Sequence, residues 1–139
     1  VNEDYPKGML TSVKTGLAML GPNTDAVMIA LVDQPMIQTA LINKLINAYG
    51  DGSKGIVIPT YNGKHGHPII VSVGFVEEIM QLDEASPEGL RAFINAHKGD
   101  WLEVPVETPG VLEDMDTPED YARLSKPAEP LYEHHKWHP

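Results

Sequence analysis

The sequence contains no cysteine, and it has only half as many basic residues as acidic ones. The missing cysteines exclude disulfides, thiolate metal sites and cysteine nucleophiles, and they fit a reducing cytosol, so a cytoplasmic location is expected. Lys and Arg number 10 against 20 Asp and Glu, which gives a formal net charge of -10. Such a charge repels nucleic acid and anionic membranes at long range, so neither is expected as a partner. A small anionic ligand remains compatible with it, because a divalent cation can bridge two acids.

Long apolar runs are also missing. No run approaches the roughly 20 residues of a membrane-spanning helix, and the first residues, VNEDYPKG, lack the basic-then-apolar pattern of a signal peptide. The chain does not open with Met, which leads us to expect a piece of a longer protein. The composition is that of an ordinary globular domain, and 139 residues suffice for one domain with its own core.

Apolar periodicity predicts alternating helices and strands, which is typical of an α/β fold. The run DAVMIALVD, 25–33, shows no alternation and predicts a strand buried on both faces. Pro105 places the last predicted strand at a sheet edge. The strands at 55–59 and 69–73 flank a predicted hairpin. The predicted helices are 8–21, 38–50, 76–82, 89–97 and 117–125, and the predicted strands are 25–33, 55–59, 69–73 and 101–107.

Asp33, in the stretch LVDQP at 31–35, closes the first predicted strand. Ligands of open α/β sheets bind outside the carboxyl ends of the strands. A carboxylate there suits Mg²⁺, which takes few protein ligands and keeps substrate phosphates at its other positions. The alternative is a strand-end aspartate that caps the following turn.

The stretch VLEDMDTPEDYARL, 111–124, holds more carboxylates than a helix start requires. Thr117 fits an N-cap, and Asp120 follows it at the spacing of a capping box. Asp114 and Asp116 fall on one side of an extended segment, where two converging carboxylates repel each other unless they are protonated or bound to metal. A solvated acidic loop avoids that repulsion and is the alternative. Together with Asp33, the pair favours a Mg²⁺-bridged nucleotide.

Two further stretches and the tail contain residues suited to ligand binding. In GKHGHP, 63–68, the glycines allow close backbone approach and His67 can act as acid or base; the alternative is a tight hairpin turn with an exposed histidine. In KGMLTS, 7–12, Gly8 leads into a helix whose early amides, with the hydroxyls of Thr11 and Ser12, can meet a nucleotide; the alternative is a plain capped helix start. The three histidines of EHHKWHP are interpreted as part of a solvated tail.

These stretches, in this order, resemble the MobA-like NTP transferase family, and within it the molybdenum cofactor cytidylyltransferases. The combination of DQP, GHP and D-x-DTPED is specific, whereas each motif alone would be weak. The matching residues are NEDYPKGMLTSVKTGL (2–17), VMIALVDQP (27–35), IVIPTYNGKHGHPIIV (56–71) and DMDTPEDY (114–121).

The resemblance implies a three-layer, Rossmann-like nucleotide-diphospho-sugar transferase fold with a mostly parallel sheet. It implies a Mg²⁺-dependent nucleotidyltransferase in which a phosphorylated pterin attacks the α-phosphate of CTP and pyrophosphate leaves. By the same resemblance Asp33 and Asp116 would be the catalytic metal ligands and Asp114 their electrostatic partner, while Glu113 is interpreted as a surface charge. The nucleotide would lie along Gly8, Met9, Thr11 and Ser12, and the acceptor would face Gly66, His67 and Pro68.

The family's glycine-rich signature loop, which holds the triphosphate, has no counterpart in this sequence. The N-terminal βαβ portion is therefore expected to be absent, with 1–125 forming the C-terminal two thirds of the domain and 126–139 a tail. We expect the isolated chain to be a weak catalyst or none, with an open sheet edge that a longer protein, self-association or a molybdoenzyme partner would cover. Two alternatives stay open: a non-catalytic pterin- or protein-binding module that helps molybdoenzyme maturation, and transfer of guanylyl or another nucleotide.

Overall fold

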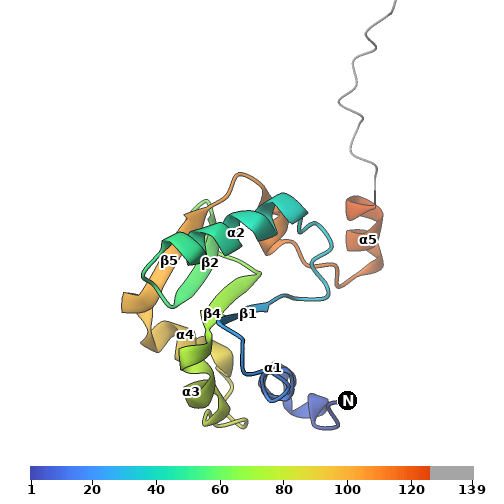
Figure 1. The fold of residues 1–139 in the computed structure, drawn as a ribbon. Coiled ribbons are helices and arrows are strands. Elements are labelled where there is room, and N and C mark those ends of the chain that lie inside the picture. The colour runs from blue at the N-terminus through green and yellow to red at the C-terminus, as the bar shows by residue number, and fades with distance from the viewer. Residues whose placement is uncertain (126–139) are drawn as a thin grey trace, which may run out of the picture.

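The computed structural model describes residues 1–125, which form a five-stranded sheet between two layers of helices (Figure 1). No helix in this part of the chain is long and apolar enough to cross a membrane. The strands are β1 (Ala26–Ile29), β2 (Ile56–Tyr61), β3 (Lys64–His65), β4 (Ile69–Ser72) and β5 (Trp101–Pro105). The helices are α1 (Met9–Leu17), α2 (Thr39–Asp51), α3 (Val76–Met80), α4 (Leu90–Ala96) and α5 (Pro118–Leu124), with short 3₁₀ turns at Tyr5–Lys7, Val73–Phe75, Lys98–Asp100 and Pro109–Leu112.

The sheet runs in the order β1, β4, β2, β5, and β3 folds back on the end of β2. β1, β2 and β5 share one direction, because β4 is antiparallel to β1 and to β2 while β5 is parallel to β2. The predicted Rossmann-like α/β class is therefore present, although three of the four strand pairings are antiparallel, two of them made by β4 and one by β3. The predicted antiparallel pairing of the strands at 55–59 and 69–73 is confirmed by β2 and β4. The connection between them also contains β3, which the sequence did not predict. The turn from β2 to β3, Asn62-Gly63, has positive φ at both residues, as a type I′ turn requires.

The prediction that 25–33 is a strand buried on both faces is wrong. β1 covers only Ala26–Ile29, and its residues are half-buried. The reason is its place at the sheet edge, where β4 is its only strand partner among residues 1–125. An apolar run does not distinguish an edge strand from a central one. The expected open edge is thus present at β1, and the prediction that β5 lies at an edge is confirmed.

Each face of the sheet has its own apolar core. α2 covers one face, where Leu45 packs in a cluster with Val57, Ile70 and Val104. α1, α3 and α4 cover the other face, as Figure 1 shows. α1 ends at Leu17 rather than at residue 21, and the chain turns before β1. The buried residues of this second core are Leu10, Leu17, Ile56, Ile58, Ile69, Val71, Ile79, Leu90 and Phe93.

α5 follows the acidic stretch and begins with the predicted capping box between Thr117 and Asp120, which is confirmed. Hydrogen bonds from Thr117 and Arg123 lower the pKa of the Asp120 carboxyl. Glu113, interpreted from the sequence as a surface charge, forms an ion pair with the exposed Arg123 at 3.0 Å. This pair ties α5 to the segment that precedes it.

Candidate functional site

The loops that follow β1 and β5 meet the GHP turn, which lies between β3 and β4. The side-chain amide of Gln34 donates a hydrogen bond to the Asp114 carboxylate at 2.8 Å, across a sequence separation of 80 residues. The backbone amide of Met115 donates a hydrogen bond to the carbonyl of Asp33 at 2.8 Å. The backbone amide of His67 donates one to the carbonyl of Val111, in the loop after β5, at 3.0 Å. These bonds bring the LVDQP, GHP and D-x-D motifs together, at the position where open α/β sheets bind ligands.

Gly66 lets the GHP turn approach Val111 closely. A Cβ atom at Gly66 would lie 2.3 Å from the carbonyl oxygen of Val111 and 2.7 Å from its Cβ. Val111 is fully buried and has no room to retreat. Glycine is therefore required here by packing alone, whatever ligand the turn faces.

Asp33 presents a buried carboxylate oxygen that has no hydrogen-bond partner. Its Oδ1 and the Oε1 of Gln34 are both buried, and neither accepts a hydrogen bond from the described residues. An unpaired buried acceptor costs about 1–3 kcal/mol, which a bound water or cation would relieve. Oxygen donors of this kind are the ligands that Mg²⁺ prefers, so the donor set fits a divalent cation. Across residues 1–125 no three His, Asp or Glu side chains gather around one point, so such a cation would complete its shell with water or phosphate oxygens.

Asp116, the second expected ligand, is exposed on the segment before α5. The bond between Met115 and Asp33 holds this segment against the LVDQP loop, one residue away from Asp116. The side-chain contact to that loop is made instead by Asp114, through Gln34. The sequence does not identify Gln34 as a site residue, because no pattern in a loop sequence shows that a glutamine becomes buried.

Burial lowers the pKa of His67 below its ordinary value of 6.5, against the opposing effect of the Asp114 and Asp33 carboxylates. The neutral imidazole is therefore favoured near pH 7. In this form one ring nitrogen accepts a hydrogen bond and the other donates one.

We expect the imidazole of His67 to titrate below 6.5 when followed by NMR. The folded state then binds fewer protons than the unfolded state, so this group reduces the free energy of unfolding as pH falls from about 6.5 toward the folded pKa. His67→Asn should lessen the loss of stability between pH 8 and pH 5.5, as measured by urea unfolding. A titration midpoint above 6.5 would contradict this prediction.

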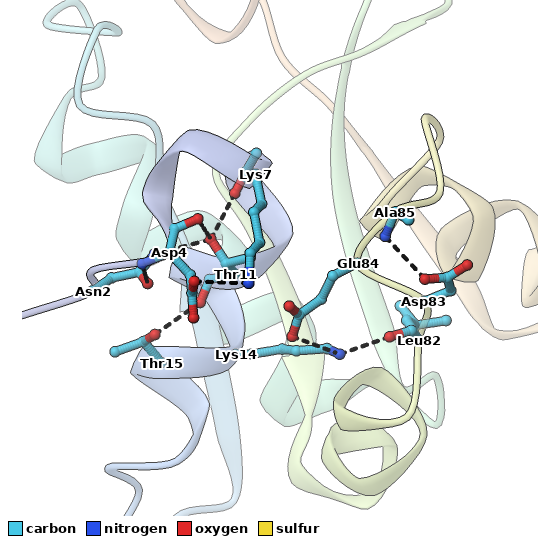
Figure 2. A network of polar contacts seen from close by, with 11 residues as sticks. Asn2, Asp4, Lys7, Thr11, Lys14, Thr15, Leu82, Asp83, Glu84 and Ala85 are labelled. Carbon is cyan, nitrogen blue, oxygen red and sulfur yellow. Dashed lines mark hydrogen bonds and ion pairs between the residues drawn. The ribbon is translucent and has the colours of Figure 1, made fainter.

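The KGMLTS stretch forms a closed polar network at the start of α1 (Figure 2). Thr11 is buried; its hydroxyl donates to the carbonyls of Gly8 at 2.9 Å and Asp4 at 3.1 Å, and accepts from the Asn2 amide at 2.9 Å. Gly8 has a φ of 122°, which favours glycine. The Thr11 hydroxyl thus has its hydrogen-bond partners within the turn, and both residues are accounted for by local structure.

Met9 and Ser12 line an open groove of about 440 Å³ along the free edge of β1, and Asp33 lines the same groove. A second pocket, of about 400 Å³, lies between the GHP turn and α4; Gly66, His67 and again Met9 line it. The structure therefore places part of the expected nucleotide set beside Asp33, and most of the expected acceptor set around a neighbouring pocket. Two of the expected residues lie elsewhere. Gly8 lines a third pocket together with residues 83–90, and Pro68 is fully buried.

Residues 1–101 match the model of the MobA-like NTP transferase domain. The chain is 29% identical over 120 residues to the molybdenum cofactor cytidylyltransferase of Escherichia coli K12, a match that covers 86% of this chain and 58% of that protein. The crystal structure of Rv0371c from Mycobacterium tuberculosis H37Rv aligns with a TM-score of 0.70 and 25% identity, over 81% of this chain and 57% of that one. A structure of Rv0371c in complex with manganese aligns with a TM-score of 0.64 and 25% identity, over 81% and 58% of the two chains. The chain thus spans less than two thirds of the length of these relatives.

Proposed function

Because this chain belongs to the MobA-like NTP transferase family, we propose that the protein transfers the CMP unit of CTP to a phosphorylated pterin in molybdenum cofactor maturation. The similarity to a molybdenum cofactor cytidylyltransferase supports the choice of nucleotide and acceptor. The manganese complex of a structural relative supports a divalent cation, for which we propose Mg²⁺. We also propose that 1–125 is the C-terminal two thirds of the transferase domain, and that the remaining third supplies the triphosphate cradle.

The observation that carries this proposal is the buried Oδ1 of Asp33, in the loop that follows β1, which has no hydrogen-bond partner among the described residues. Asp33 and Asp116 would hold the cation, with Asp33 anchored by its backbone bond to Met115. When bound, Mg²⁺ neutralises charge on the phosphates, which is what nucleotidyl transfer chiefly requires. No side-chain nucleophile is needed, because positioning and charge neutralisation carry most of phosphoryl transfer.

In the proposed reaction, a phosphate oxygen of the acceptor forms a bond to the α-phosphorus of CTP. The bond between that phosphorus and the bridging oxygen breaks, and pyrophosphate leaves with the bonding electron pair. Met9 and Ser12 would orient the nucleotide in the groove beside Asp33. His67, as a neutral imidazole, would donate a hydrogen bond to a phosphate oxygen on the acceptor side.

The proposal is tested by measuring pyrophosphate release from each of the four ribonucleoside triphosphates in the presence of a phosphorylated pterin and Mg²⁺. The assay uses the protein as its gene encodes it. We expect kcat/KM for CTP to exceed that for GTP at least about tenfold, a difference of roughly 1.4 kcal/mol in transition-state binding. Chelation of the cation should abolish release, and Mg²⁺ should restore it. A preference for GTP would overturn the cytidylyl assignment, and pterin binding without release from any nucleotide would replace the enzyme with a binding module.

A further inference from the structure

The pocket beside α4 is bordered by a cation that forms no ion pair within residues 1–125. Arg91, Ile94 and Asn95 line the pocket, and their spacing of three and four residues places them on one face of the helix. Arg91 is exposed, and its guanidinium makes no ion pair or hydrogen bond with any side chain or carbonyl that the structure describes. Glu88 is the single carboxylate residue among those that line the pocket.

Arg91 stands out in a chain whose net charge is -10. Residues 1–125 contain eight Lys and Arg, and within this part of the chain only Arg91 and Lys64 lack a protein partner. Lys64 does not line the pocket. The six others contact a carboxylate, a backbone carbonyl or an aromatic ring: Lys7, Lys14, Lys44, Lys54, Lys98 and Arg123.

The rest of the pocket is apolar and aromatic. Ile58 and Ile69 line it from the sheet, and the indole ring of Trp101 lines it from β5. The indole is held in place, because its Nε1 donates to the carbonyl of Ile94 at 2.9 Å and His65 packs edge-on against it at a ring distance of 4.8 Å. Such a surface accepts a flat heterocycle, while the exposed guanidinium at its border attracts an anion.

We propose that this pocket binds the acceptor, with Arg91 as the positioning residue for its phosphate and the Trp101 side of the pocket receiving its flat ring. The inference rests on the proposed function in one respect, namely that the acceptor is a heterocycle carrying a phosphate. The planar guanidinium matches phosphate oxygens in a two-point contact, and Asn95, one turn further along α4, offers an amide donor. His67 lines the same pocket and belongs to the loop cluster around Asp33. A phosphate bound here would thus share His67 with the loop cluster that contains Asp33, the proposed metal ligand.

Binding is measured by quenching of Trp101 fluorescence in a Trp137→Phe background, since the chain has two tryptophans. The probes are a pterin monophosphate and the same pterin without its phosphate. Wild type should bind the phosphorylated probe at least about tenfold more tightly, which is typical of a charge-assisted hydrogen bond. Arg91→Gln should remove this preference, Arg91→Lys should keep part of it, and Lys64→Gln, the matched control, should retain it fully. The acceptor KM of Arg91→Gln should rise by a similar factor while the KM for CTP stays unchanged.

The outcomes separate this inference from the proposed function. An Arg91→Gln variant that keeps the wild-type phosphate preference, or that weakens both probes equally, would overturn the pocket assignment. A wild-type protein without any phosphate preference would do the same. CMP transfer with an unchanged acceptor KM in Arg91→Gln would leave the proposed function standing and refute the pocket. An Arg91-dependent phosphate preference in a protein that transfers no nucleotide would refute the function and support the pocket.

Discussion

Replacement of Asp33 with asparagine should lower kcat/KM for nucleotidyl transfer at least about a hundredfold, because the proposed metal ligand loses its charge. The amide has nearly the same shape as the carboxylate, and the bond from Met115 goes to the backbone carbonyl, so the loop cluster should stay in place. The buried Oδ1 has no hydrogen bond to lose within the described part of the chain, and the stability of the fold should change little. Pyrophosphate release measures the activity, and calorimetric titration with Mn²⁺ measures the loss of metal affinity independently of turnover.

Asp25→Asn is the matched control for this variant. Asp25 precedes β1 at its opposite end and is exposed, and only its backbone carbonyl takes part in described hydrogen bonds. The control should keep wild-type turnover and metal affinity. If Asp33→Asn retained turnover within about twofold of wild type, the assignment of Asp33 as a metal ligand would be wrong.

Gly66→Ala should reduce the free energy of unfolding by about 3 kcal/mol, at the upper end of what overpacking of a buried site costs. The added methyl group would meet the carbonyl oxygen of Val111 at 2.3 Å, and a backbone atom cannot rotate away as a side chain can. Relief of this clash would separate the GHP turn from the β5 loop and weaken the bond from His67 to Val111. Urea unfolding should therefore show a lower midpoint, and turnover should fall with it.

Gly50→Ala provides the matched glycine control. Gly50 lies in α2, and a Cβ there would meet no atom within 4 Å. Alanine is favoured over glycine in a helix by about 0.5–1 kcal/mol, so this variant should be slightly more stable than wild type. Equal stability of Gly66→Ala and wild type would show that the turn does not depend on its contact with Val111.

Interactions within a few residues of the chain were predictable from the sequence. The capping box of Thr117 and Asp120, the Asn62-Gly63 turn and the approximate bounds of α2 and α5 all follow from the chemistry of neighbouring residues. The position of Asp33 in the loop cluster was also predictable, because a carboxylate that follows an apolar strand is expected at the ligand edge of the sheet; its role as a metal ligand stays a prediction. The roles of Glu113 and Thr11 were not, since each depends on a partner chosen by the fold: Arg123 for the first, and the Asn2 amide for the second.

The sequence by itself determined which segments become helices and strands and which loops carry carboxylates and histidines. The tertiary structure alone decided that β4 lies between β1 and β2, which leaves β1 half-buried at an edge. It also decided that Gln34 joins Asp114 and that Arg91 shares a pocket with His67. The physical reason is that periodicity and capping depend on neighbours along the chain. Contacts between distant segments decide which strand lies at an edge, which loop side chain is buried and which distant residues meet, and no local pattern encodes those contacts.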